Sequence, residues 1–272
     1  MSTGNSGVSK AHRTQKGKVG MASINKALFS VVRVEAYSNQ FGITQNALLS
    51  RATGFLYKNS NDELFLVTNK HVVHDPREAY YPDFLVVHVR CKLRAWSKTE
   101  PVRLELYASK RARWRIPADK KADVAVLPIA YEDLPGESVA VPLSNADALP
   151  KSCHSTLGSQ AMVLGFPKGA FYDPSSNFPV CRIATIATLP WLTFKKRNCF
   201  LIDARLHEGM SGSPVISMPR SIYEKDNKPV YNDVRCYLLG IFSSEWLWGG
   251  EPLGLNTVWP TDLVEEATKE GD

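Results

Sequence analysis

Short runs of apolar residues follow one another from Leu28 onward, separated by turn residues and without any long helical periodicity. Runs of this length and spacing are typical of β-strands in a sandwich or barrel. The first series of predicted strands comprises Leu28–Ala36, Ala52–Tyr57, Glu63–Thr68, Phe84–Cys91, Val102–Leu106, Arg111–Ile116 and Asp123–Pro128. The second comprises Gln160–Phe166, Val180–Thr188, Cys199–Ala204, Ser213–Ser217, Val234–Ser243 and Gly254–Pro260. We therefore expect an all-β fold.

A polar interval that contains prolines and a glycine separates the two series, from Tyr131 to about Ser159. Such intervals mark linkers, so we place one over residues 134–159. The division predicts an N-terminal β-barrel over residues 27–133 and a C-terminal β-barrel over residues 160–272. The chain closes with Thr261–Thr268, for which we expect a short helix with Thr261 as its N-cap.

Composition places the chain among ordinary globular proteins, since 44% of its residues are apolar. It has no apolar run of the roughly 18–20 residues that span a membrane. The N-terminus lacks the apolar core of a secretory signal, so we expect a cytoplasmic protein without membrane association. The five cysteines are scattered, with no CxxC pair, which favours reduced thiols and gives no reason to expect a metal or another cofactor.

The net charge of +6 is concentrated in two segments. Residues 1–26 hold five Lys/Arg and no acid, and we interpret them as a disordered basic tail, although they also weakly resemble an organelle-targeting peptide. Residues 92–121 hold ten Lys/Arg and three acids. There Arg111, Arg113 and Arg115 alternate with apolar residues, as on the solvent face of a strand. We therefore do not expect nucleic-acid binding.

A serine in a tight turn between two glycines dominates the second half, in the stretch Glu208–Val215. A serine hydroxyl becomes a strong nucleophile only with a base and with donors for the developing oxyanion. His71 directly follows the predicted strand Glu63–Thr68, and histidine suits the role of a base near neutral pH. Asp123 opens an apolar strand, where a partly buried carboxylate needs a donor such as a histidine ring N–H.

The residues around these three positions resemble the trypsin-like (chymotrypsin-fold) serine proteases, closest to the HtrA-type and glutamyl-endopeptidase-like branches. The resemblance rests on five segments that occur in the family's order: Thr68–Val73, Ala122–Val126, Val163–Pro167, Gly209–Val215 and Leu239–Ser243. Together they cover about residues 28–268. Each segment alone is only moderately specific, whereas their order along the chain is strongly so.

The resemblance implies two packed six-stranded β-barrels with a short C-terminal helix. It also implies a serine endopeptidase that cleaves protein or peptide substrates through an acyl-enzyme intermediate. Ser211 would attack the scissile carbonyl, His71 would accept and return its proton, and Asp123 would orient the imidazole. The backbone N–H groups of Gly209 and Ser211 would form the oxyanion hole.

Two positions depart from the family pattern. Met210 stands before the nucleophile where secreted members carry an aspartate that pairs with the new N-terminus after activation, and Ser213 replaces the more common glycine. Activation by N-terminal cleavage is therefore not expected. Regulation by an activating partner protein is an open alternative.

Specificity is less constrained by the sequence. By the resemblance, the primary substrate pocket would be walled by Arg205, Leu206, Glu208, Ser243, Ser244, Glu245 and Asn256. Arg205 would favour an acidic side chain, unless it points outward, whereas Glu208 and Glu245 would favour a basic one. The functional alternative to a peptidase is a locked or inactive protease-fold protein that serves as a partner-binding module.

Overall fold

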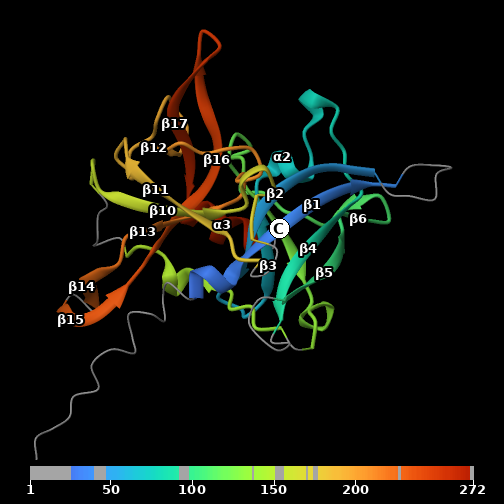
Figure 1. Cartoon of the computed structure of the whole chain (residues 1–272), viewed down its shortest axis with the longest axis horizontal. Helices are drawn as coiled ribbons and strands as arrows, with labels where there is room; N and C mark the ends of the chain where they lie inside the picture. The colour runs from blue at the N-terminus through green and yellow to red at the C-terminus, as the bar shows by residue number, and fades with distance from the viewer. Residues whose placement is uncertain are drawn as a thin grey trace, which may run out of the picture.

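The computed structural model describes residues 26–39, 47–91, 98–136, 138–150, 156–169, 171–173, 177–225 and 228–269. They form two β-rich halves that lie side by side (Figure 1). Of the predicted tail, residues 1–26, all but Lys26 lie outside the described residues, and Lys26 begins a helical turn over residues 26–30.

The first half is a curled seven-stranded sheet with the strand order β5-β4-β1-β2-β3-β8, and β9 pairs with β2. Its strands are β1 (Val31–Ser38), β2 (Ala47–Lys58), β3 (Leu64–Thr68), β4 (Phe84–Cys91), β5 (Lys98–Glu105), β8 (Ala125–Ile129) and β9 (Leu143–Ser144). All pairs are antiparallel except β2 with β9. Strand β9 comes from the interval that we interpreted as a linker, so part of this interval belongs to the first sheet.

The second half is a closed barrel in which the strands follow the order β10-β11-β12-β17-β16-β13. They are β10 (Gln160–Gly165), β11 (Val180–Ile186), β12 (Phe200–Asp203), β13 (Pro214–Ser217), β16 (Leu238–Trp248) and β17 (Glu251–Pro260). Helix α3 (Thr261–Thr268) follows β17. The expected all-β fold with a short C-terminal helix is confirmed. The second half is a closed barrel, and the first half is a sheet that curls like a barrel without closing.

Several short elements complete the described chain. They are α2 (Lys70–Val73), the 3-10 turns Pro76–Glu78, Tyr131–Asp133, Asn145–Asp147 and Pro167–Gly169, the small hairpin β6 (Tyr107–Ala108) and β7 (Arg111–Ala112), and the hairpin β14 (Arg220–Lys225) and β15 (Lys228–Arg235). The second hairpin projects from the barrel (Figure 1). It was not predicted from the sequence.

Two local predictions were wrong. The strand expected over Arg111–Ile116 ends at Ala112, because the chain then turns and Arg115 forms an isolated bridge with Val126 of β8. Thr261 is the first residue of α3 and not its N-cap, which is Pro260. The Thr261 hydroxyl instead donates to the carbonyl oxygen of Leu238, at 3.1 Å, and so ties the helix to β16.

Residues 52–57 of β2 and all five residues of β3 are buried on both faces, which explains why these stretches contain no charged residue. Phe55 and Phe65 face a core cluster that the two halves share. Leu56 and Leu66, one residue further along, face the interior of the first sheet. A third cluster fills the closed barrel. The shared cluster makes the two halves one packed unit.

Of the four cysteines that the structure describes, Cys91, Cys199 and Cys236 are buried and Cys181 is exposed. Within the described ranges, no helix has the length and apolar character needed to cross a lipid bilayer.

Thr53, a fully buried residue of β2, joins the first sheet to the second half. Its hydroxyl donates to the carbonyl oxygen of Gly209 at 2.7 Å and accepts from the backbone N–H of Phe166 at 3.0 Å. Its backbone N–H donates to the carbonyl oxygen of Ser211 at 2.9 Å. One residue of the first half therefore holds the serine-bearing loop of the second.

We expect Thr53→Val to destabilise the protein, because valine keeps the shape of threonine but leaves two buried backbone groups without a partner. Each such group costs about 1–3 kcal/mol. Thr53→Ser is the matched control, since it keeps the hydroxyl and loses one methyl group, worth about 0.8 kcal/mol. Urea denaturation measures both free energies of unfolding. Equal losses in the two variants would contradict a role for the hydroxyl.

Candidate active site

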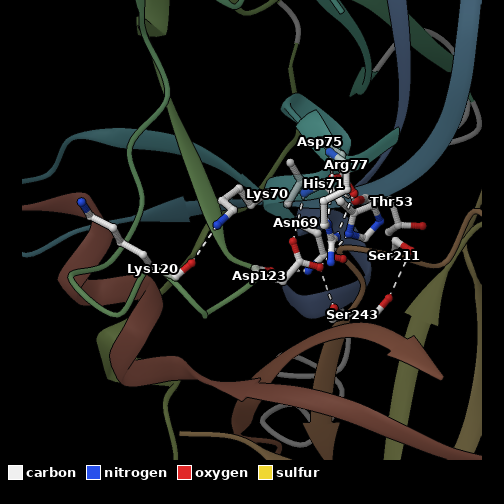
Figure 2. A network of polar contacts seen from close by, with 11 residues as sticks. Thr53, Asn69, Lys70, His71, Asp75, Arg77, Lys120, Asp123, Ser211 and Ser243 are labelled. Atoms are coloured by element: carbon white, nitrogen blue, oxygen red, sulfur yellow. Dashed lines mark hydrogen bonds and ion pairs between the residues drawn. The ribbon is translucent and has the colours of Figure 1, made fainter. Parts of the chain in front are cut away.

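The pairing of β3 with β8 brings His71 and Asp123 together. These strands are antiparallel, with Thr68 opposite Ala125, so the residues just after β3 lie beside those just before β8. His71 lies in α2, directly after β3. Its ring Nδ1 lies 2.6 Å from Asp123 Oδ2, and its backbone N–H donates to Asp123 Oδ1 at 2.9 Å (Figure 2).

Two further residues hold Asp123. Ser243, in β16 of the closed barrel, donates its hydroxyl to Asp123 Oδ2 at 2.6 Å. Asn69 donates its side-chain N–H to the backbone oxygen of Asp123 at 2.7 Å. Sequence reasoning placed Ser243 in a pocket wall and missed this contact, because nothing in the sequence indicates that β16 reaches β8. The carboxylate thus receives donors from both halves of the molecule.

The histidine and the aspartate shift each other's pKa. Burial lowers the pKa of His71, but the hydrogen bond and the negative charge of Asp123 outweigh it, so this pKa lies above its ordinary value of 6.5. Burial likewise raises the pKa of Asp123, but the donors His71 and Ser243 outweigh it, and the pKa lies below its ordinary value of 3.8. Near neutral pH the carboxylate is therefore ionised, and Nδ1 of His71 carries the proton that it donates to Asp123.

Ser211 lies in a turn that requires glycine on either side. Gly209 and Gly212 have φ angles of +86° and +89°, which other residues rarely adopt. A Cβ at position 212 would also lie 2.0 Å from the carbonyl oxygen of Thr53. The Ser211 hydroxyl lines the same cleft as His71 but donates to the carbonyl oxygen of Ser243, at 3.2 Å (Figure 2).

The turn also leaves two backbone donors available. The carbonyl oxygen of Glu208 accepts from the N–H of Lys168 at 2.5 Å. In a trans peptide the next N–H, that of Gly209, points the opposite way. Across the described residues, no hydrogen-bond acceptor takes up the N–H of Gly209 or of Ser211. Two donors therefore lie next to the serine hydroxyl and can bind an oxyanion.

Met210, the unusual residue before the serine, is fully buried. Its side chain belongs to the apolar cluster inside the barrel, together with Leu206. A buried carboxylate at this position would need a cationic partner, whereas methionine needs only apolar neighbours. The structure thus explains why methionine is compatible with the ordered turn.

Two clefts meet at His71, which lines both. The first, of about 430 Å³, contains Ser211, Gly209 and Glu208. The second, of about 530 Å³, contains Asp123, Ser243 and Ser244. A polypeptide that crosses the site at His71 has room on either side of it.

The seven residues predicted for the primary substrate pocket do not all line one cleft. Glu208 lines the first cleft and Ser243 and Ser244 line the second, whereas Arg205, Leu206, Glu245 and Asn256 line neither. Among these four, Arg205 is exposed and Leu206 is buried in the barrel core. Glu245 accepts from the N–H of Gly254 at 3.0 Å, and the Asn256 side chain donates to Ala204 and Gly254. Within the part of the chain that the structure describes, no cluster of His, Cys, Asp and Glu side chains could hold a metal ion.

We expect an NMR titration of the His71 ring to give a pKa above 6.5 in the wild-type protein. Asp123→Asn should lower this pKa, because it removes the charge that stabilises the imidazolium and leaves the effect of burial. Asp75→Asn is the matched control: Asp75 also raises the pKa of His71 by its charge, but without a hydrogen bond, so the decrease should be smaller. Equal decreases in the two variants would show that the hydrogen bond to Asp123 does not control the titration.

Comparison with known proteins agrees with this geometry. A search of curated proteins gave no match. The family model described as trypsin-like peptidase domain matches residues 52–220, more than half of the chain and the part that contains His71, Asp123 and Ser211. The chain therefore belongs to the trypsin-like peptidase domain family.

Proposed function

We propose that this protein is a serine endopeptidase that hydrolyses peptide bonds in protein substrates through an acyl-enzyme intermediate. One observation carries the proposal: His71, which is hydrogen-bonded to Asp123, shares a cleft with Ser211, whose turn carries two backbone N–H groups without an acceptor among the described residues. Membership of the trypsin-like peptidase domain family supports a protease-type function.

In the proposed mechanism Asp123 keeps the His71 proton on Nδ1, so that Nε2 has a free lone pair. The Ser211 hydroxyl turns from the carbonyl oxygen of Ser243 to Nε2, and its oxygen attacks the scissile carbonyl carbon as its proton passes to His71. The N–H groups of Gly209 and Ser211 receive the resulting oxyanion. A single donor of this kind contributes about 3–4 kcal/mol to transition-state stabilisation.

The second half of the reaction uses the same groups. His71 gives the proton to the leaving amine, the C–N bond breaks, and the acyl group stays on Ser211. Water then attacks the ester while His71 takes one of its protons. The bond between the acyl carbon and the Ser211 oxygen breaks, His71 returns the proton to that oxygen, and the acid product leaves. The raised pKa of His71 fits this cycle. The hydrogen bond and the charge of Asp123 that raise it also stabilise the imidazolium that forms in each step.

The buried Met210 favours an oxyanion turn that does not depend on pairing with a new N-terminus. We propose that the enzyme needs no activation cleavage of that kind. Control by a partner protein, the placement in the HtrA-type or glutamyl-endopeptidase-like branches and the cytoplasmic location stay predictions.

A fluorophosphonate probe should label the wild-type protein at Ser211, because such probes react only with an activated serine. Ser211→Ala should abolish labelling and lower kcat on unfolded casein by roughly 10⁶-fold. Ser213→Ala is the matched control: this hydroxyl lies two residues away, is buried and has no hydrogen-bond partner among the described residues, so labelling should persist. A folded wild-type protein that is not labelled would favour the locked, partner-binding alternative.

A further inference from the structure

The second cleft is strongly basic. Five Lys/Arg side chains line it: Lys70, Arg77, Lys120, Lys121 and Arg197. Two of the described residues that line it carry a carboxylate, and both are engaged: Asp75 pairs with Arg77 at 2.9 Å and Asp123 pairs with His71. We call it the basic cleft.

Four of these cations lack an anionic partner. In the described ranges, no carboxylate lies within ion-pair distance of Lys70, Lys120, Lys121 or Arg197. The Lys70 ammonium donates only to the backbone oxygen of Lys120, at 2.8 Å. Like charges gathered along a cleft create a local positive potential that attracts anions.

Arg197 is held in place by aromatic contacts. Its guanidinium carbon lies 5.4 Å from the centre of the Trp246 ring, within the range of a cation–π contact. Trp246 packs edge-to-face against Phe194, with ring centres 5.6 Å apart. Two backbone hydrogen bonds join Phe194 to Arg197. These contacts favour a placement of the exposed Arg197 guanidinium beside Trp246.

The first cleft differs in charge. Its cations Arg51 and Lys168 both have carboxylate partners, Glu35 at 3.4 Å and Glu208 at 3.1 Å. Glu208 also lines this cleft, as does Glu78, which has no ion pair with any described residue. The site is thus neutral to acidic on the Ser211 side of His71 and basic on the Asp123 side, where Figure 2 shows Lys70 and Lys120.

We propose that the basic cleft is a substrate subsite that selects acidic side chains on one side of the scissile bond, beyond the residue next to that bond. The proposal rests on the proposed peptidase function. Because His71 borders both clefts, a polypeptide that reaches Ser211 extends into the basic cleft. Among the seven residues predicted for the primary pocket, only Ser243 and Ser244 line the basic cleft. The selection of acidic side chains by the basic cleft is therefore additional to the selection made by the primary pocket.

A binding experiment separates this proposal from catalysis. Ser211→Ala protein is titrated with a fluorescein-labelled peptide containing four glutamates, and with the same peptide carrying glutamine instead. We expect the glutamate peptide to bind about tenfold more tightly at low salt. This preference should disappear at about 1 M salt, where charges are screened over about 3 Å. Equal affinities at low salt would overturn the proposal, whether or not the wild-type enzyme is active.

Reversing the charge of two lysines tests whether the preference for the glutamate peptide arises in the basic cleft. Lys120→Glu/Lys121→Glu, made in the Ser211→Ala protein, should remove the preference for the glutamate peptide. Lys98→Glu/Lys110→Glu is the matched control, because it also reverses two charges, at exposed lysines that do not line the cleft. An unchanged preference in the double variant would overturn the assignment. So would a single-stranded oligonucleotide that displaces the peptide with equal affinity, since it would indicate a general polyanion surface.

Cleavage then tests selection during turnover. A peptide library digested with the wild-type enzyme should show Asp and Glu enriched on one side of the cut sites, and the double variant should lose this enrichment. Cut sites without acidic enrichment would contradict the subsite while leaving the peptidase function intact. Absence of both cleavage and fluorophosphonate labelling would instead contradict the peptidase function, and the binding experiment would still decide the subsite.

Discussion

The partly buried charge of Asp123, whose side chain is 21% exposed, is the constraint on which the site depends. An ionised carboxylate is stable away from water only when hydrogen-bond donors surround it. Its donors are the backbone and the ring of His71, from the first half, and the hydroxyl of Ser243, from the second. The two halves must therefore pack together to complete the set of donors around the carboxylate, which couples assembly of the site to folding of the whole molecule.

The serine loop depends on the same junction. Thr53 binds the carbonyl oxygens of Gly209 and Ser211, and the glycine at position 212 allows the backbone to approach Thr53. These contacts fix the turn from the outside while Met210 anchors it in the apolar interior of the barrel. With its carbonyl groups held in this way, the turn is fixed before any substrate binds, so the proposed binding of an oxyanion by the N–H groups of Gly209 and Ser211 would need no rearrangement of the backbone.

The sequence was sufficient to predict those features that depend on the local apolar pattern and on the order of residues along the chain. Short apolar runs predicted the all-β fold. The order of His71, Asp123 and Ser211 singled out residues that the fold brings near one another, since His71 pairs with Asp123 and shares a cleft with Ser211. Sequence reasoning failed where contacts between distant segments decide the structure. Arg115 leaves the predicted strand because Val126 offers a backbone bridge, and Thr261 binds Leu238 and does not cap the helix. The contact of Ser243 with Asp123 joins residues 120 positions apart, and no local pattern indicates it.

The charges of Lys120 and Lys121 illustrate the same limit. In the sequence they belong to a basic segment for which a solvent-exposed strand face is a sufficient explanation. In the structure they precede Asp123, so the pairing of β8 with β3 carries them to the rim of the cleft beside His71. Arg197, 76 residues further along the chain, reaches the same cleft from the closed barrel. The topology that assembles His71 and Asp123 therefore also brings cations from both halves to one cleft. The positive charge of the cleft results from this topology and from the exposed Lys and Arg residues at its rim.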